Sequence, residues 1–528
     1  MFFTSRILTS QRSFIRVSLR LINNSSPITK GKHGIDQIDY IKSAISNQSE
    51  IEWSTVRDNT LQMPGTVNEK NLDAVLLKLM VNTKKFDAAL SYAEYCKKTY
   101  NQLTLGCTNG LLFLFYEMSK INKLTSEQKT FILESYNSLY EKYKILDTTT
   151  CERLLHALCA INEWKKALKV LEDINFSGKP SHSAYSTLIS ALFDNNKKGE
   201  AIKLINRSVS DNRALQTNAY VAWINYIQKK YKERKTKLKY LEDICLHIFN
   251  NSVTINEETA KSIQDVYTSL GWNANVAKIK KNDGECSCCL KKLDCLKITE
   301  DEFLNLQKNI KDKLIVGSDL FLKTSPQELD RFLKFVDDSA PYDIVLDALN
   351  IAYVARKNSL ERVKVLSTVV NYFANRNKKI LLLGRKHMLH WPKKLMSDIL
   401  KKTSHFFTDD LTQDDPYFIT AAILSGANTD IVSKDLLRGH RFLLKDKQLA
   451  LIFRRWQWQH QWMVFINKGK NLIIQPPLRF TPCAQKKDGA WHLPVENENE
   501  DMTSVSHNIN DGVPDLSTWL CLRPRAVE

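Results

Sequence analysis

The first 35 residues of this 528-residue chain contain no aspartate and no glutamate. Arginine recurs there instead, at Arg6, Arg12, Arg16 and Arg20, among apolar, serine and threonine residues. An amphipathic, arginine-rich and acid-free start is typical of a mitochondrial transit peptide, whereas a secretory signal needs a longer unbroken apolar centre. We therefore predict that residues 1–35 direct the chain to the mitochondrial matrix. An RNA-binding basic tail is the alternative interpretation.

Long apolar runs and excess negative charge are also missing. The chain has no stretch of about 18 apolar residues free of charge, so no membrane span is predicted. It carries 76 Lys and Arg against 58 Asp and Glu, a formal net charge of +18. Such an excess of positive charge favours a polyanionic partner, with a merely basic matrix protein as the alternative. In a reducing matrix the 11 cysteines would be thiols or metal ligands rather than disulfides.

Glycine and proline are scarce between about residues 70 and 275, where apolar residues recur at helical spacing. The pattern also repeats, because residues 154–168 align with residues 188–202. A period of about 34 residues indicates a solenoid of helical hairpins. The units resemble pentatricopeptide repeats, which hold RNA, more than tetratricopeptide repeats. We assign residues 70–280 to this RNA-binding domain, with a protein-binding solenoid as the alternative.

A cysteine knuckle follows the repeats. Cys286 and Cys289 form a C-x2-C pair, the spacing that lets two thiolates grip one tetrahedral zinc ion. One knuckle supplies only two ligands, and the candidates for the others are Cys288, Cys295, His492 and Cys521. If the last two complete the site, zinc would pin the C-terminal segment to the knuckle. A pair of buried free thiols is the alternative.

Strand and helix patterns alternate from about residue 341 to 474, which predicts a parallel α/β sheet. Acidic residues fall at or just past the ends of predicted strands, namely Asp347, the pair Asp414 and Asp415, and Asp435. Ligands bind outside the carboxyl ends of strands in such sheets. An isolated buried carboxylate is costly, so their convergence predicts a Mg²⁺ or Mn²⁺ site, to which Asn350 can add a neutral oxygen. For the pair before Pro416 alone, a helix N-cap is the alternative.

These motifs resemble those of the protein-only ribonuclease P family, and in particular those of its animal mitochondrial form. Residues 343–352 are similar to the first nuclease motif of the family, and residues 409–418 and 433–438 to its later motifs. The resemblance covers nearly the whole chain. It implies a multidomain α + α/β fold: an N-terminal α-helical pentatricopeptide-repeat solenoid, a split zinc-binding central domain (281–340 and 475–528) and a C-terminal NYN/PIN-like metallonuclease domain (341–474).

The resemblance also implies which residues carry the chemistry. The catalytic, Mg²⁺-binding (or Mn²⁺-binding) residues would be Asp347, Asp414, Asp415 and Asp435, and a structural Zn²⁺ would be held by Cys286, Cys289, His492 and Cys521. The family commonly ends its last motif with Arg-Asp-His, whereas this chain reads Arg438-Gly439-His440. A carboxylate near the metal is therefore missing, while His440 would orient water or contact phosphate, with a surface histidine as the alternative.

The function that follows from the resemblance is that of an endoribonuclease. It would remove the 5′ leader from mitochondrial precursor tRNAs by attack of a Mg²⁺-activated water, leaving a 5′-phosphate on the tRNA. The resemblance also implies two partner subunits, a tRNA methyltransferase and a short-chain dehydrogenase. The alternatives are a nuclease of the same fold that acts on other structured RNA and a catalytically weak or dead RNA-binding scaffold, which Gly439 favours.

Overall fold

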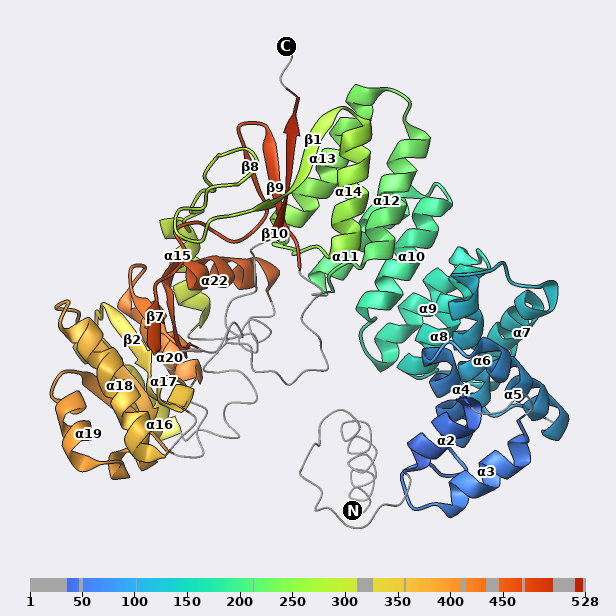
Figure 1. Cartoon of the computed structure of the whole chain (residues 1–528), viewed down its shortest axis with the longest axis horizontal. Helices are drawn as coiled ribbons and strands as arrows, with labels where there is room; N and C mark the ends of the chain where they lie inside the picture. Colours follow the sequence, from blue (N-terminus) through green and yellow to red (C-terminus); the bar gives the residue numbers. More distant parts are fainter. Residues whose placement is uncertain are drawn as a thin grey trace, which may run out of the picture. The chain divides into compact units, whose positions relative to one another are not determined.

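The computed structural model describes residues 36–46, 51–100, 102–211, 213–310, 326–355, 358–409, 415–433, 446–467, 471–496 and 518–525. The chain forms two compact units, residues 1–141 and residues 142–528 (Figure 1). The predicted transit peptide lies outside the described residues, as do Asp414, Asp435, Gly439 and His440. Within the described part, every helix is too short or too polar to cross a lipid bilayer.

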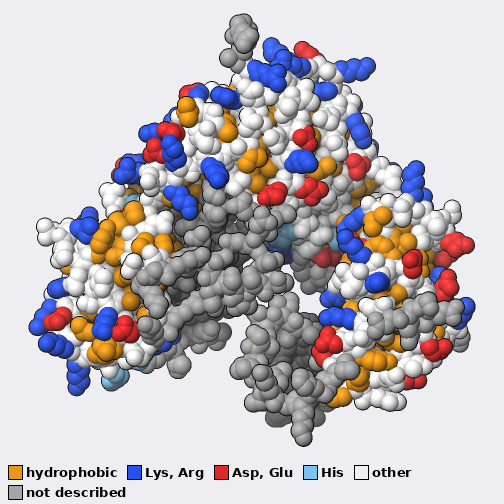
Figure 2. All heavy atoms as spheres, viewed as in Figure 1, with side chains coloured by type: hydrophobic (Ala, Val, Ile, Leu, Met, Phe, Trp, Pro, Cys, Tyr) orange, Lys and Arg blue, Asp and Glu red, His pale blue; other side chains and the backbone are white. Residues whose placement is uncertain are grey.

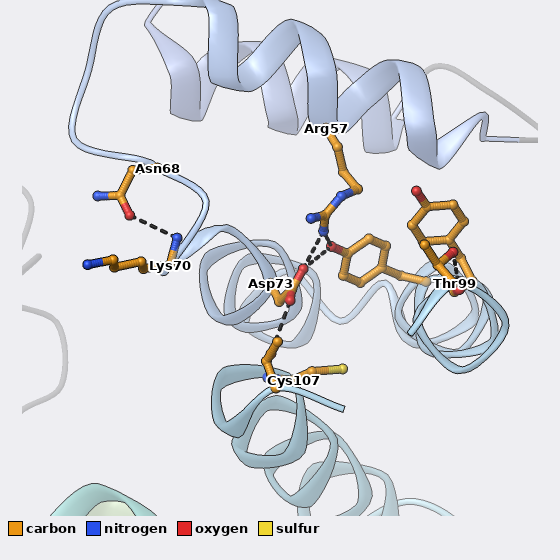
Figure 3. A network of polar contacts seen from close by, with 9 residues as sticks. Arg57, Asn68, Lys70, Asp73, Thr99 and Cys107 are labelled. Atoms are coloured by element: carbon orange, nitrogen blue, oxygen red, sulfur yellow. Dashed lines mark hydrogen bonds and ion pairs between the residues drawn. The ribbon is translucent and has the colours of Figure 1, made fainter. Parts of the chain in front are cut away.

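The first unit is helical. Its helices are α2 (Gln37–Ser46), α3 (Trp53–Gln62), α4 (Leu72–Asn82), α5 (Phe86–Thr99), α6 (Leu105–Ser119) and α7 (Ser126–Lys142), of which α2 and α3 precede the region predicted from the sequence. A buried carboxylate links four of these helices (Figure 3). Asp73 of α4 accepts hydrogen bonds from Arg57 of α3, from the Tyr92 hydroxyl of α5 at 2.7 Å and from Thr104, the N-cap of α6, at 3.1 Å. These donors offset the cost of burying the charge.

The second unit begins with a row of helical hairpins. They comprise α8 (Thr148–Ala160), α9 (Trp164–Ser177), α10 (His182–Asp194), α11 (Lys198–Ser210), α12 (Thr217–Lys230), α13 (Arg234–Asn250) and α14 (Glu257–Ser269). Asn162 and Asn196 take the left-handed conformation, with φ of 67° and 61°, in the turns before α9 and α11. Asparagine tolerates that conformation better than most residues. The predicted helical repeat is confirmed.

The helical prediction is wrong at its far end, because a strand begins at Trp272. Strand β1 (Trp272–Lys278) joins an antiparallel sheet of order β1-β10-β9-β8 with β10 (Thr518–Pro524), β9 (Ala490–Pro494) and β8 (Gln485–Lys487). Its partner β10 lies more than 200 residues away in the sequence, so the local apolar spacing carries no sign of the pairing. The segment that directly follows the helical repeats and the C-terminal segment of the chain therefore meet in one sheet.

The third part of this unit is a six-stranded sheet of order β4-β3-β2-β5-β6-β7. Its strands are β2 (Ile344–Asp347), β3 (Ile380–Arg385), β4 (Ser404–Thr408), β5 (Asp430–Val432), β6 (Gln461–Ile466) and β7 (Leu472–Gln475). Only the β6–β7 pairing is antiparallel. The predicted α/β fold of this region is confirmed.

Helices cover both faces of this sheet and create two cores. On one face Val345 packs in a core with α15 (Glu300–Ile310), α16 (Pro326–Ser339), α20 (Asp415–Ser425) and α22 (Lys447–His460). On the other face Ile344 and Leu346 pack with α17 (Ala348–Ala352), α18 (Ser359–Ala374) and α19 (Lys393–Leu400). Alternate residues of β2 thus enter opposite cores, as the pleat of a strand requires, and this fixes the register that presents Asp347 at the carboxyl end.

Candidate functional site

The order of strands around β2 creates a topological switch point at one edge of the sheet, the place where open α/β sheets form their ligand crevice. From β2 the chain crosses to β3 and then β4 on one side, and it later returns to place β5 on the other side. Connections leave in opposite directions on either side of the β2–β5 boundary, and ligands of open α/β sheets bind at the carboxyl ends of strands at such a point. Asp347 ends β2, and Ser433 directly follows β5.

Asp347 is held rigidly at this crevice. Its side chain is only 6% exposed. The backbone N–H of Asn350 donates to Oδ1 at 3.0 Å, which makes Asp347 the N-cap of α17, and the Ser433 hydroxyl donates to Oδ2 at 3.1 Å. Each carboxylate oxygen therefore has a donor, which compensates part of the cost of burial and fixes the rotation of the group.

Ser433 is itself fixed by the neighbouring strand. It is fully buried, its N–H donates to the Trp462 carbonyl at 3.4 Å, and its carbonyl accepts from the Gln461 side chain at 2.8 Å. The sequence analysis did not assign Ser433 to the site. A hydroxyl residue directly after a buried strand at the sheet edge was the only available signal, because Asp347 lies 86 residues away in the chain.

The other predicted aspartates are only partly placed. Helix α20 begins at Asp415, and its first turns are anchored by Tyr417, whose ring meets Phe332 of α16 with centroids 4.7 Å apart. Asp414 and Asp435 lie outside the described residues. Asn350 is half-buried in α17, where its backbone N–H donates to the N-cap residue Asp347.

A second residue that the sequence analysis missed supports the segment before the acidic pair. Glu328, in the first turn of α16, is 1% exposed, and its Oε1 accepts the backbone N–H of Asp409 at 2.7 Å. The Asp409 carboxylate also forms an ion pair with Lys386, just after β3. Nothing in the local sequence around Glu328 signals this role, because its partner is 81 residues away.

The structure brings four sulfur and nitrogen ligands together on the smaller sheet. The ligand atoms of Cys286, Cys289, His492 and Cys521 all lie within 4.8 Å of one another. His492 and Cys521 are directly paired across β9 and β10, and Cys289 Sγ lies 3.1 Å from His492 Nε2. The other two candidates are directed elsewhere: the Cys288 thiol contacts the Val276 carbonyl at 3.5 Å, and Cys295 is exposed.

The surroundings of this cluster favour a thiolate. A hydrogen bond from the Cys521 thiol lowers the pKa of Cys286 well below its ordinary value, and His492 and the backbone N–H groups of Cys289 and Cys288 act in the same direction against desolvation. Cys286, His492 and Cys521 are almost fully buried, and His492 Nδ1 has no hydrogen-bond partner among the described residues. A buried set of three thiols and one imidazole matches the donor set of a closed, structural zinc site.

Comparisons with known proteins agree with this architecture. The family model described as protein-only RNase P matches residues 280–521. The chain is 30% identical over 459 residues to the mitochondrial ribonuclease P catalytic subunit of Mus musculus, covering 85% of this chain and 75% of that one. It is 30% identical over 424 residues to the corresponding subunit of Rattus norvegicus, covering 78% and 69%.

A solved structure shares the fold. The crystal structure of nuclear proteinaceous RNase P 2 from Arabidopsis thaliana superposes with a TM-score of 0.55 at 18% identity, covering 87% of this chain and 100% of that one. With relatives that are 30% identical along most of their length, the chain belongs to the protein-only ribonuclease P family and is an endoribonuclease.

Proposed function

We propose that this enzyme removes the 5′ leader from mitochondrial precursor tRNAs, using Mg²⁺ in the crevice at β2 and β5. The observation that carries the proposal is the position of Asp347, a buried carboxylate at the point where ligands bind in this class of sheet. The rodent relatives are named mitochondrial ribonuclease P catalytic subunits, which supports the substrate class and the compartment. The acid-free segment 1–35 supports import into the matrix.

Asp347, Asp414, Asp415 and Asp435 would hold the ion, with Asn350 and His440 in supporting positions. Carboxylate oxygens of this kind are the ligands that Mg²⁺ selects. When bound, the ion neutralises charge on the reacting phosphate and lowers the pKa of a bound water. The chain itself contributes a carboxylate whose rotation is fixed by the Asn350 N–H and the Ser433 hydroxyl, so little reorganisation is needed when the ion and the substrate arrive.

Zn²⁺ on Cys286, Cys289, His492 and Cys521 would have a structural role. All four protein ligands are present, so the site leaves no open position for a substrate. The ion would lock the knuckle to the β9–β10 pair and so hold the two segments of the split central domain together. In this way it would support the nuclease domain, whose chain lies between those two segments.

The decisive experiment is cleavage of a precursor tRNA with a labelled 5′ leader in Mg²⁺ by the purified chain together with the two partner subunits proposed below. We expect a single cut at the leader junction and a 5′-phosphate on the tRNA, and we expect the Asp414→Asn, Asp415→Asn double variant to be inactive. An unrelated hairpin serves as the control substrate. Wild-type protein that cleaves no better than the double variant would instead favour a scaffold role, as the Gly439 substitution in the last motif suggests.

Two further measurements address the partners and the compartment. We propose that a tRNA methyltransferase subunit and a short-chain dehydrogenase subunit assemble with this enzyme, so their addition should raise the cleavage rate. Addition of an unrelated methyltransferase is the control. Import assays with and without residues 1–35 test delivery to the mitochondrial matrix, and import that is unchanged by the deletion would contradict the transit-peptide proposal.

A further inference from the structure

An exposed tyrosine lies close to the candidate metal site. Tyr353 directly follows α17 and begins the short 3-10 helix η2 (Tyr353–Ala355), and 47% of its surface is exposed. Its neighbours Leu349 and Val354 pack against the core on this face of the sheet, whereas Tyr353 belongs to neither core of the nuclease domain. Figure 2 shows that the visible face of this domain carries apolar side chains, in orange, beside Lys and Arg side chains, in blue. The ring of Tyr353 is therefore available to a ligand.

Helix α17 aligns this tyrosine with the residues of the crevice. One side of the helix faces the core and carries its buried residues, Ala348, Ile351 and Ala352. Asn350 and Tyr353, which are three positions apart, share the opposite side, and that side begins at the N-cap residue Asp347. At about 1.5 Å per residue, the backbone of Tyr353 lies about 9 Å along the helix from that of Asp347. A nucleotide next to the one held at Asp347 can therefore reach the ring.

An arginine covers one face of the ring. The Arg362 guanidinium carbon lies 4.0 Å from the ring centroid of Tyr353, which is a close cation–π contact. Arg362 belongs to the first turns of α18, which packs against α17 and η2 (Figure 1). Among the described residues no hydrogen bond or ion pair draws this guanidinium elsewhere, so its contact with the ring sets its position. The opposite face of the ring is left for a second flat group.

We propose that Tyr353, backed by Arg362, stacks against an unpaired base of the RNA leader next to the scissile phosphate. Aromatic rings bind unpaired bases by stacking, whereas the bases of an RNA helix are already paired and stacked on one another. In a precursor tRNA the cut separates a single-stranded leader from a paired acceptor stem, so the unpaired base lies on the leader side. The inference rests on the proposed function, because it takes the scissile phosphate to be bound at Asp347.

The contact would orient the leader as it leaves the crevice. A base held on a fixed ring restricts the phosphate between that base and the acceptor stem, and restricted geometry at the reacting group favours an in-line attack. Every base has a flat π face, so stacking tolerates all four bases. Binding should therefore depend on the presence of a leader base rather than on its identity.

The test compares wild type with Tyr353→Leu, which removes the ring, and Tyr353→Phe, which keeps it. Each full-length protein, with the two proposed partner subunits, is titrated without added Mg²⁺ against three RNAs. These are a precursor tRNA with an ordinary leader, the same RNA with abasic nucleotides at the leader positions next to the cut, and the mature tRNA. We expect Tyr353→Leu to bind the ordinary precursor about tenfold more weakly than wild type, and Tyr353→Phe to bind it like wild type. The abasic precursor and the mature tRNA should each bind equally to all three proteins.

A direct signal of stacking comes from 2-aminopurine, a fluorescent adenine analogue, placed as the first leader nucleotide. Its fluorescence should fall on binding to wild type and to Tyr353→Phe, because stacking quenches it, and should remain high with Tyr353→Leu. Phe176→Leu is the matched control, since Phe176 is another exposed ring, in α9 of the repeat region, with 78% of its surface in solvent. Quenching by this control should equal that by wild type.

Equal affinity of wild type and Tyr353→Leu for the ordinary precursor, with equal quenching, would overturn the inference. A loss of the same size on the abasic precursor would also overturn it, because a structural role or a contact with a partner subunit does not depend on a leader base. If wild type quenches the probe through Tyr353 but cleaves no precursor tRNA in Mg²⁺, the proposed function fails and the stacking contact stands. Leader cleavage with unaltered quenching in Tyr353→Leu gives the reverse result.

Discussion

The cysteine–histidine cluster and the aspartate crevice position their ligands in different ways. In the cluster, His492 and Cys521 face each other across paired strands, and the knuckle folds onto them. In the crevice, Asp347 ends a strand, whereas Asp415 begins a helix after a connecting segment. Strand pairing fixes two ligands of the closed site and the knuckle supplies the other two, while ligands that follow strand ends leave room for a substrate. The difference corresponds to that between a structural and a catalytic metal site.

The largest expected effect comes from dismantling the cluster. His492→Ala and Cys521→Ala should each abolish stoichiometric zinc and lower the unfolding midpoint by about 10 °C or more, because the binding free energy of a structural zinc stabilises only the folded state. Zinc per chain, measured by atomic emission, and thermal unfolding test this. Cys288→Ser is the matched control and should keep its zinc, since the Cys288 thiol contacts the Val276 carbonyl instead. Full zinc content in the His492 variant would contradict the assignment.

Asp347→Asn should produce the largest effect on catalysis without a comparable effect on stability. Losing an anionic ligand of the proposed Mg²⁺ site should slow leader removal by about a thousandfold, which corresponds to roughly 4 kcal/mol of transition-state stabilisation. The control is Asp343→Asn, directly before the same strand and away from its carboxyl end, where the carboxylate accepts the Lys379 N–H at 2.7 Å. Similar cleavage rates for the two variants would show that the crevice is not the catalytic site.

Much of the fold and part of both candidate sites could be predicted from the sequence. The features that could not be predicted share one cause, which is that they depend on residues far apart in the chain. The strand–helix alternation, Asp347 at a strand end and the helical repeats are local patterns. The pairing that gathers the cluster is not local, because Cys289 and His492 are 203 residues apart, and spacing alone left Cys288 and Cys295 equally plausible as ligands. The extension of the helical prediction beyond Trp272 failed for the same reason. A strand whose only partner is distant has no periodicity that reveals that partner.

Ser433→Ala tests whether the residue that orients Asp347 contributes to catalysis. Removing the hydroxyl that donates to Asp347 Oδ2 should reduce the cleavage rate by about tenfold to a hundredfold and raise the Mg²⁺ concentration needed for half-maximal rate, as for other groups that orient metal ligands. Ser425→Ala is the control, since that buried hydroxyl in α20 has no hydrogen-bond partner among the described residues. An unchanged Mg²⁺ dependence in the Ser433 variant would assign it to packing alone.

The smallest expected effect concerns Glu328, which acts on the connecting segment rather than on a strand. Glu328→Gln keeps an oxygen that can accept the Asp409 N–H, so we expect a change in rate of about threefold or less. Glu328→Ala leaves that N–H without its acceptor, at a cost of roughly 1–3 kcal/mol, and should slow cleavage by about tenfold. Single-turnover cleavage rates report on the crevice, and zinc content reports on the cysteine–histidine cluster, so both are measured on each variant. If the crevice depends on this segment as the cluster depends on strand pairing, the Ala variant will lose rate while keeping its zinc. Equal rates for the Gln and Ala variants would mean that the strand ends alone position the aspartates.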